Sequence, residues 1–153
     1  ITAMLQQQPM MKDITLERDL AAAGDSVRAD PQRLRQVFLN LLINASDAIG
    51  QQAEPVGGNI LIESRNIPVK ADGVNQLQII VTDDGPGISE EELNNIFDPL
   101  YTPKEPGKGT GLGLSVCFMI MEEIGGALRA EAAAEQGTRF ILTFPTIERN
   151  ATR

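Results

Sequence analysis

The sequence predicts an α+β domain, a two-layer α/β sandwich in which helices cover one face of a mixed β-sheet. Two long stretches have the apolar periodicity of helices, and five short runs have the pattern of strands. These elements are mixed along the chain without a strict β-α-β rhythm, so we expect the helices on one sheet face. A chain of 153 residues is long enough for one domain with a core.

The first half of the chain alternates strand and helix signals. Residues 14–20 alternate apolar and polar side chains and predict a half-exposed strand. Asp30 followed by Pro31 is typical of a helix start, and the helix is expected to run to about Gln52. A pair of glycines then turns the chain into a strand over 59–66.

The middle of the chain combines one strand, one short helix and two loops. Residues 68–75 predict a hairpin loop with Asp72-Gly73 at its tip, followed by an inner strand over 77–82. Ser89 is placed to cap a short acidic helix over 90–96. The proline-rich stretch 97–109 predicts a long loop, which in a compact domain is functional or disordered.

The last third closes the domain. A second main helix is predicted over 110–124, and the two glycines that follow it end the helix. Strands are expected over 127–134 and 138–144.

Composition limits the function. The formal net charge is −8, whereas nucleic-acid binding needs a basic surface. No apolar run reaches the length of a membrane span, and no signal segment opens the chain. Cys117 is the only cysteine, so no intrachain disulfide is possible, and it is expected in the core. We expect a cytoplasmic domain without nucleic-acid or membrane contact, whether or not the full-length protein is membrane-anchored.

The chain contains no histidine and begins without a methionine in a Gln- and Met-rich segment. We interpret residues 1–12 as the tail of an upstream helix or linker, residues 13–146 as the folded domain and residues 147–153 as a C-terminal tail. The chain is therefore expected to be a fragment of a longer protein.

A polar stripe on the first helix is the most informative pattern. At about 100° per residue, the stripe places its five members on one face of an otherwise apolar helix: Arg33, Gln36, Asn40, Asn44 and Asp47. Asparagine is a poor helix former, because its side chain competes for backbone hydrogen bonds. The stripe indicates either a binding seam or an ordinary solvated edge.

Two glycine-rich segments accompany the stripe. Asp83, Gly85 and Gly87 follow a strand-like run, where the glycines permit a sharp turn beside a carboxylate. Residues 107–115 contain four alternate glycines ahead of an apolar helix, an arrangement that can turn backbone N–H groups toward an anion. The second segment matches neither a P-loop nor a dinucleotide-binding turn. A plain turn and a flexible hinge are the alternatives.

Taken in order, these segments resemble the ATP-binding catalytic domain of sensor histidine kinases, in the superfamily that includes gyrase B, Hsp90 and MutL. The Asn40–Asn44 helix resembles the N box, and Asp83 to Gly87 resembles the G1 box. The remaining boxes follow along the chain: residues 96–104 as the F box, 107–115 as the G2 box and 137–140 as the G3 element. The resemblance implies the Bergerat-type ATP-binding fold, with residues 13–146 as the ATP-binding catalytic domain.

The resemblance also implies roles at a site for ATP or ADP with Mg²⁺. Asn44 would offer an amide oxygen to the metal. Asp83 would accept a hydrogen bond from the adenine amino group, with Thr138 helping through water. The resemblance places these residues around the nucleotide: Asn44, Asp47, Asp83, Gly85, Gly87, Ile88, Phe97, Thr102, Lys108, Gly109, Thr110, Gly111, Leu112, Gly113 and Thr138.

Catalysis is expected to involve Asn40 and Lys104. Asn40 stands where the hydrolysing relatives and the sigma-factor serine kinases have Glu, and an amide cannot take a proton at neutral pH. Asp47 stands where many histidine kinases have a basic residue, so Lys104, or else Lys108, is expected to supply that phosphate contact. Plain solubility of an acidic domain is the alternative for both lysines.

The implied function is transfer of the ATP γ-phosphate to a histidine on a separate dimerisation domain, for relay to an aspartate of a response regulator receiver domain. The alternatives are a nucleotide-sensing module of the same fold and a gyrase-type dimer clamp. Residues 97–109 are expected to form an ATP lid that orders with nucleotide, anchored by Phe97, Leu100 and Tyr101.

Overall fold

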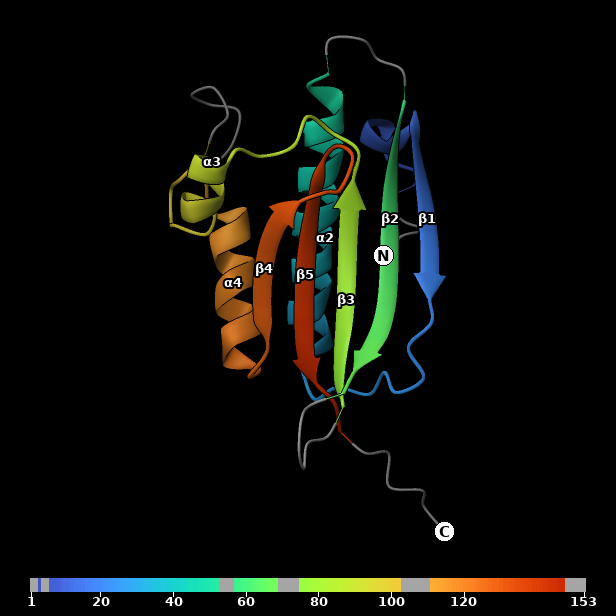
Figure 1. Ribbon diagram of the computed structural model, residues 1–153, viewed down its shortest axis with the longest axis vertical. Coiled ribbons are helices and arrows are strands. Elements are labelled where there is room, and N and C mark those ends of the chain that lie inside the picture. The colour runs from blue at the N-terminus through green and yellow to red at the C-terminus, as the bar shows by residue number, and fades with distance from the viewer. Residues whose placement is uncertain (1–2, 4–5, 53–56, 69–74, 103–110, 148–153) are drawn as a thin grey trace.

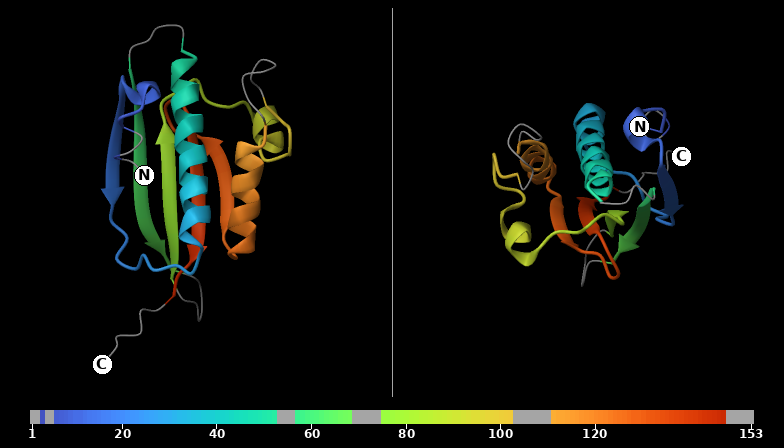
Figure 2. Two further views of the ribbon diagram at one scale, coloured as in Figure 1. Left: turned by 180° about the vertical axis from the view of Figure 1, so that it is seen from behind. Right: turned by 90° about the horizontal axis from the view of Figure 1, so that it is seen from above.

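A computed structural model describes residues 3, 6–52, 57–68, 75–102 and 111–147. These residues form a single five-stranded sheet with two long helices packed on one face (Figure 1, Figure 2), which confirms the predicted α+β two-layer sandwich. The predicted hairpin tip Asp72-Gly73 lies outside the described residues.

The sheet contains β1 (Ile14–Leu20), β2 (Gly58–Ile67), β3 (Gln76–Asp83), β4 (Ala127–Ala132) and β5 (Thr138–Pro145). Its strand order is β1-β2-β3-β5-β4. The β1 and β2 strands run parallel, and every other neighbouring pair runs antiparallel, so the sheet is mixed. Figure 1 shows β3 at the centre, with its carboxyl end at the same end of the sheet as the C-terminal end of the long helix α2.

The helices are α2 (Pro31–Gly50), the short α3 (Glu90–Asn95) and α4 (Gly113–Glu123), and a 3-10 turn, η1 (Pro9–Met11), precedes β1. Both α2 and α4 lie on one face of the sheet, and α3 lies beyond the β4 edge, close to the start of α4 (Figure 2). Within the described residues, no helix is both long enough and apolar enough to cross a membrane.

Local sequence explains where α2 begins. The Asp30 carboxylate accepts a hydrogen bond from the Gln32 backbone N–H at 2.8 Å, and Pro31 occupies the first helical turn. The side chain therefore satisfies one of the free N–H groups that every helix start leaves.

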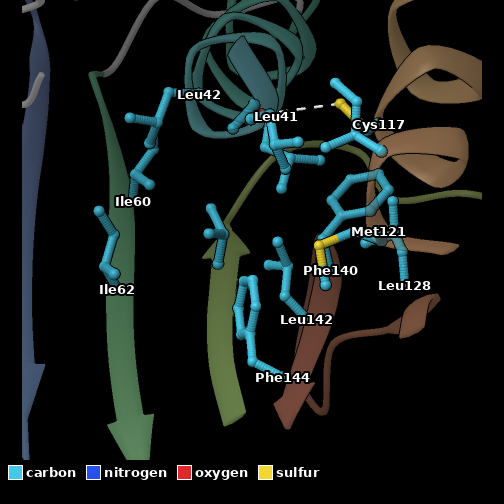
Figure 3. Close-up of a cluster of buried hydrophobic side chains, with 14 of the residues drawn as sticks. Leu41, Leu42, Ile60, Ile62, Cys117, Met121, Leu128, Phe140, Leu142 and Phe144 are labelled. Atoms are coloured by element: carbon cyan, nitrogen blue, oxygen red, sulfur yellow. Dashed lines mark hydrogen bonds between the residues drawn. The ribbon is translucent and has the colours of Figure 1, made fainter. Parts of the chain in front are cut away.

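The core lies between the two long helices and the sheet (Figure 3). Leu42 of α2 lies beside Ile60 of β2, Leu41 lies closer to α4, and Met121 of α4 packs toward Phe140 of β5. Cys117 is completely buried, which confirms its predicted place in the core, and this burial raises the pKa of its thiol to about 11. Apolar burial of this kind supplies most of the stability of a domain.

The start of α4 differs from the sequence prediction. The helix begins at Gly113 and not at residue 110, because Gly111 has a φ of +66°, which no right-handed helix contains. The predicted strand over 127–134 is also shorter, since β4 ends at Ala132. Glycine at 111 therefore ends the preceding loop and is not part of the helix.

Candidate functional site

A cavity of about 490 Å³ opens beside the C-terminal half of α2, between that helix, the loop after β3, α3 and the first turn of α4. Its size lies within the range of small-molecule and cofactor pockets. The cavity is lined by Asn40, Ile43, Asn44, Asp47, Ala48, Gln51, Pro86, Gly87, Ile88, Glu92, Ile96, Tyr101, Thr102, Gly111, Gly113, Leu114 and Thr138.

The C-terminal part of the polar stripe of α2 forms one wall. Asn40, Asn44 and Asp47 all line the cavity, as expected for residues three and four apart on one helix face. Asn40 Nδ2 donates to the carbonyl oxygen of Gly113 at 3.2 Å, so this side chain ties α2 to the first residue of α4. The last three of the five stripe residues thus form a cavity wall, whereas Arg33 and Gln36 lie outside the lining.

Asp83 lies just behind this cavity at the end of β3, with only 2% of its surface exposed. Its Oδ1 accepts from the Gly85 backbone N–H at 2.9 Å, and the Thr138 backbone N–H also donates to the carboxylate. Burial raises the pKa of Asp83 to about 6 despite these two donors, with a smaller contribution from the charge of Asp84. The carboxylate is therefore held in place but poorly solvated.

Gly85 keeps the space beside this carboxylate open. A Cβ on Gly85 would lie 2.9 Å from Asp83 Oδ1 and 3.1 Å from the Cβ of Ala48, which lines the cavity. Any side chain at this position would therefore fill the gap between the carboxylate and the cavity wall. This lack of space explains why glycine follows two residues after the aspartate in the Asp-x-Gly pattern.

At two further positions, 137 and 111, the backbone conformation and the close approach of another segment require glycine. Gly137 has a φ of +100°, and a Cβ there would come within 1.8 Å of the Asp83 carbonyl oxygen. Gly111 has a φ of +66°, and its Cβ would meet the backbone of Leu100 at 2.5 Å. Both glycines let two backbone segments approach closely, one beside Asp83 and one at the start of α4.

The segment after α3 covers the end of the cavity near α4. Phe97 stacks on Phe118 of α4, with ring centroids 5.4 Å apart and 30° between the rings. Tyr101 and Thr102 line the cavity, whereas Leu100 is 72% exposed. Phe97 and Tyr101 thus contact the rest of the fold through their side chains, whereas the Leu100 side chain is mostly exposed and Leu100 contacts Gly111 through its backbone N–H.

The predicted site residues fall into three groups. Those that line the cavity are Asn40, Asn44, Asp47, Gly87, Ile88, Thr102, Gly111, Gly113 and Thr138. Those described outside the lining are Asp83, Gly85, Phe97 and Leu112, the last of them 44% exposed. Four predicted residues lie outside the described part of the chain: Lys104, Lys108, Gly109 and Thr110.

Sequence reasoning missed several lining residues. Ala48 and Gln51 continue the spacing of three and four from Asn44, so extending the stripe by one turn would have found them. Glu92 and Leu114 carry no such signal, because tertiary packing alone brings α3 and α4 to this cavity.

The donor set suits a nucleotide with a hard cation. Asn44 offers a neutral amide oxygen, a ligand type that Mg²⁺ accepts while keeping several waters. No group of three or more histidine, cysteine, aspartate or glutamate side chains able to hold a metal occurs among the described residues. Among the described residues, Leu112 at the start of α4 supplies no side-chain cap, and the backbone N–H groups of a first helical turn can bind an anion.

Comparisons with known proteins find relatives of this chain by sequence and by structure. Residues 29–148 match the family model described as histidine kinase-, DNA gyrase B-, and HSP90-like ATPase. Sensor histidine kinase ZraS of Salmonella typhi is 37% identical over 146 residues, which are 95% of this chain and 29% of that protein. Sporulation kinase E of Bacillus subtilis is 34% identical, over 97% of this chain and 18% of its own length.

Among solved structures, the catalytic domain of histidine kinase ThkA in a nucleotide-free form has a TM-score of 0.74 and 32% identity, covering 94% of this chain and 86% of that one. ThkA in complex with response regulator protein TrrA has a TM-score of 0.72 and 29% identity, covering 95% and 38%. The chain spans less than a third of the length of each of the two kinases compared by sequence.

Proposed function

The chain belongs to the family of histidine kinase-, DNA gyrase B- and HSP90-like ATPases and corresponds to the ATP-binding catalytic domain of sensor histidine kinases, and from this we propose that it transfers the γ-phosphate of ATP to a histidine. The 153 residues contain no histidine, so the acceptor belongs to a segment or domain outside this sequence. We assign it to the dimerisation domain of the same protein.

The observation that carries this proposal is the Asn40–Asn44 pair on the cavity wall. In our proposal Asn44 binds Mg²⁺ through its amide oxygen, and the ion neutralises phosphate charge when bound. Asn40 binds the Gly113 carbonyl and, as an amide, cannot remove a proton from water. These properties favour transfer to a good nucleophile such as imidazole over hydrolysis.

The other end of the cavity would recognise the base. Asp83 is oriented by two backbone donors and can accept a hydrogen bond from the 6-amino group of adenine. Guanine presents a carbonyl oxygen at that position, which would face the carboxylate without a proton between them. A buried polar pair left unsatisfied costs on the order of a few kcal/mol, which favours ATP over GTP.

The phosphates would lie at the end of the cavity formed by Asn40, Asn44 and the first turn of α4. Gly111 and Gly113 line the cavity without side chains, so the loop backbone and the first turn of α4 can approach an anion closely. Lys104 and Lys108 remain our candidates for a cationic contact. Phosphoryl transfer depends on positioning and charge stabilisation, so the domain needs no covalent residue of its own.

We further propose that the phosphoryl group is relayed from the histidine to an aspartate of a receiver domain. The complex of ThkA with response regulator protein TrrA supports this partner class. The reaction is proposed to take place in the cytoplasm.

Incubation of this chain with radiolabelled ATP, Mg²⁺ and the histidine-bearing domain of its own protein tests the proposal. We expect acid-labile phosphate on the histidine domain and none on this chain. Asn44→Ala should abolish the transfer and reduce ATP affinity in Mg²⁺ to its value in EDTA, with little change in the melting temperature.

The other outcomes point to other functions. Free phosphate released at a steady rate would indicate a hydrolase. Tight ATP binding with neither product would indicate a nucleotide-sensing module. Asn44→Ala with wild-type affinity for Mg²⁺ and ATP would disprove the metal assignment.

A further inference from the structure

A single peptide unit, between Asp84 and Gly85, is held from both sides. Its N–H group donates to Asp83 Oδ1 at 2.9 Å. Its carbonyl oxygen, which belongs to Asp84, accepts from Gln52 Nε2 at 2.8 Å and from Gln136 Nε2 at 3.3 Å. Because a trans peptide is planar, its C=O and N–H groups point in opposite directions, so fixing the carbonyl also fixes the direction of the N–H.

Gln52 is well placed to act as this support. It follows the last turn of α2, where its backbone N–H donates to the Ile49 carbonyl oxygen at 3.2 Å, so its backbone is anchored. The side chain is partly buried, and its bond to Asp84 is shorter than that of the exposed Gln136. The helix that carries Asn44 thus also reaches the loop that carries Asp83.

Other contacts hold Asp84 itself in place, independently of the two glutamines. Its carboxylate accepts from the Asn59 backbone N–H at 2.9 Å and from Asn59 Nδ2 at 3.1 Å. Gly137, next to Gln136, lies so close that a Cβ there would be 3.0 Å from the Asp84 Cα. With Asp84 held in this way, the two glutamines are the side chains that bind the carbonyl oxygen of this peptide.

We propose that Gln52, assisted by Gln136, is a positioning residue for the base-reading carboxylate, acting on Asp83 through the peptide between Asp84 and Gly85. This inference rests on the proposed role of Asp83 in adenine recognition. In this proposal Gln52 does not contact the base. It orients the Gly85 N–H group, and that group holds the Asp83 carboxylate in the orientation that an adenine amino group needs.

The replacement Gln52→Met tests this, because methionine keeps the length of the side chain but has no N–H donor. Gln32→Ala is the matched control: it removes an exposed glutamine at the opposite end of α2. Melting temperatures of both variants establish that each is folded.

The first measurement needs no nucleotide. Amide hydrogen exchange of Gly85, followed by NMR, should become roughly tenfold faster in Gln52→Met, since a hydrogen bond to a charged group is then weakened. It should be unchanged in Gln32→Ala. Equal exchange in Gln52→Met and the wild type would overturn the inference, whatever the nucleotide data show.

The second measurement compares ADP with inosine diphosphate, which has a carbonyl in place of the 6-amino group. We expect Gln52→Met to reduce the preference for ADP roughly tenfold. In an Asp83→Asn background the same change should have no further effect on the preference, because Gln52 acts only through that carboxylate. An equal effect in both backgrounds would overturn the inference.

The two measurements distinguish the proposed role of Asp83 in base recognition from the proposed role of Gln52 in orienting the peptide. A wild-type chain that binds ADP and inosine diphosphate equally well would refute the proposed role of Asp83 and, with it, a base-reading role for Gln52. Gly85 exchange would still decide whether Gln52 orients the peptide.

Discussion

At the residue scale, Asp83 combines burial with a negative charge. Its pKa is raised from 3.8 to about 6, mainly because burial disfavours the charged form. A carboxyl whose folded-state pKa exceeds its unfolded value stabilises the fold below the unfolded pKa and loses that contribution as the pH rises through the folded pKa. The free energy of unfolding should therefore fall between about pH 4 and pH 6 because of this group.

Asp83→Asn should remove this part of the pH dependence. Asparagine keeps an oxygen that can accept from the Gly85 N–H group but carries no buried charge. At pH 7.5 we expect the variant to be more stable by on the order of 2 kcal/mol, measured by urea unfolding from pH 4 to 8. A variant less stable than the wild type at pH 7.5 would contradict this account.

Gly137 shows how one missing side chain permits the site. Gly137→Ala forces a Cβ to within 1.8 Å of the Asp83 carbonyl oxygen at a φ of +100°. We expect a loss of about 3 kcal/mol or more in the free energy of unfolding, from strain and overpacking together. Gly125→Ala is the control, since Gly125 also has positive φ but nothing lies within 4 Å of its Cβ position, so it should cost only about 1 kcal/mol. Equal losses in the two variants would show that the close approach to Asp83 is unimportant.

At the element scale, α2 serves two purposes on two faces. One face buries apolar side chains against the sheet, and the other presents Asn40, Asn44 and Asp47 to the cavity. Asn40 and an ion pair between Arg33 and Glu123 join α2 to α4. The ion pair is half-exposed and so contributes little to stability. The helix pair is held together mainly by its apolar contacts.

Leu41→Ala tests the core face of α2. Leu41 is completely buried, so the change should cost about 2–5 kcal/mol and lower the melting temperature substantially. Leu20→Ala, at a position 61% exposed on the edge strand β1, should change the free energy of unfolding by less than about 0.5 kcal/mol. Comparable effects from the two variants, measured by denaturant unfolding, would contradict the packing described here.

At the scale of the whole molecule, the chain alone should not consume ATP. It has no histidine to accept a phosphoryl group, and Asn40 cannot act as a general base. Phosphate release with Mg²⁺ and ATP should stay far below typical enzyme rates of about 1 per second. Release at that rate, retained after repeated purification and lost in Asn44→Ala, would favour a hydrolase.

Much of the fold and part of the site follow from local patterns. The stripe of Asn40, Asn44 and Asp47 depends only on helical spacing, and the cavity wall confirms it as one face. The bounds of β1 and the cap of α2 were equally readable, because alternation and capping are local rules. The start of α4 could not be predicted in this way. It depends on the positive φ of Gly111, whose backbone meets Leu100, eleven residues earlier in the sequence.

The sequence by itself determined which segments are helices and strands, and which of them carry amides, a carboxylate and glycines. Only the tertiary structure decided what these groups contact. The strand order β1-β2-β3-β5-β4 and the bond from Asn40 to Gly113, 73 residues away, depend on long-range packing, which no local pattern encodes. The same holds for Gln52 and Gln136, which have no pattern of their own and meet at one carbonyl because the end of α2 and the β4–β5 loop pack on the same turn.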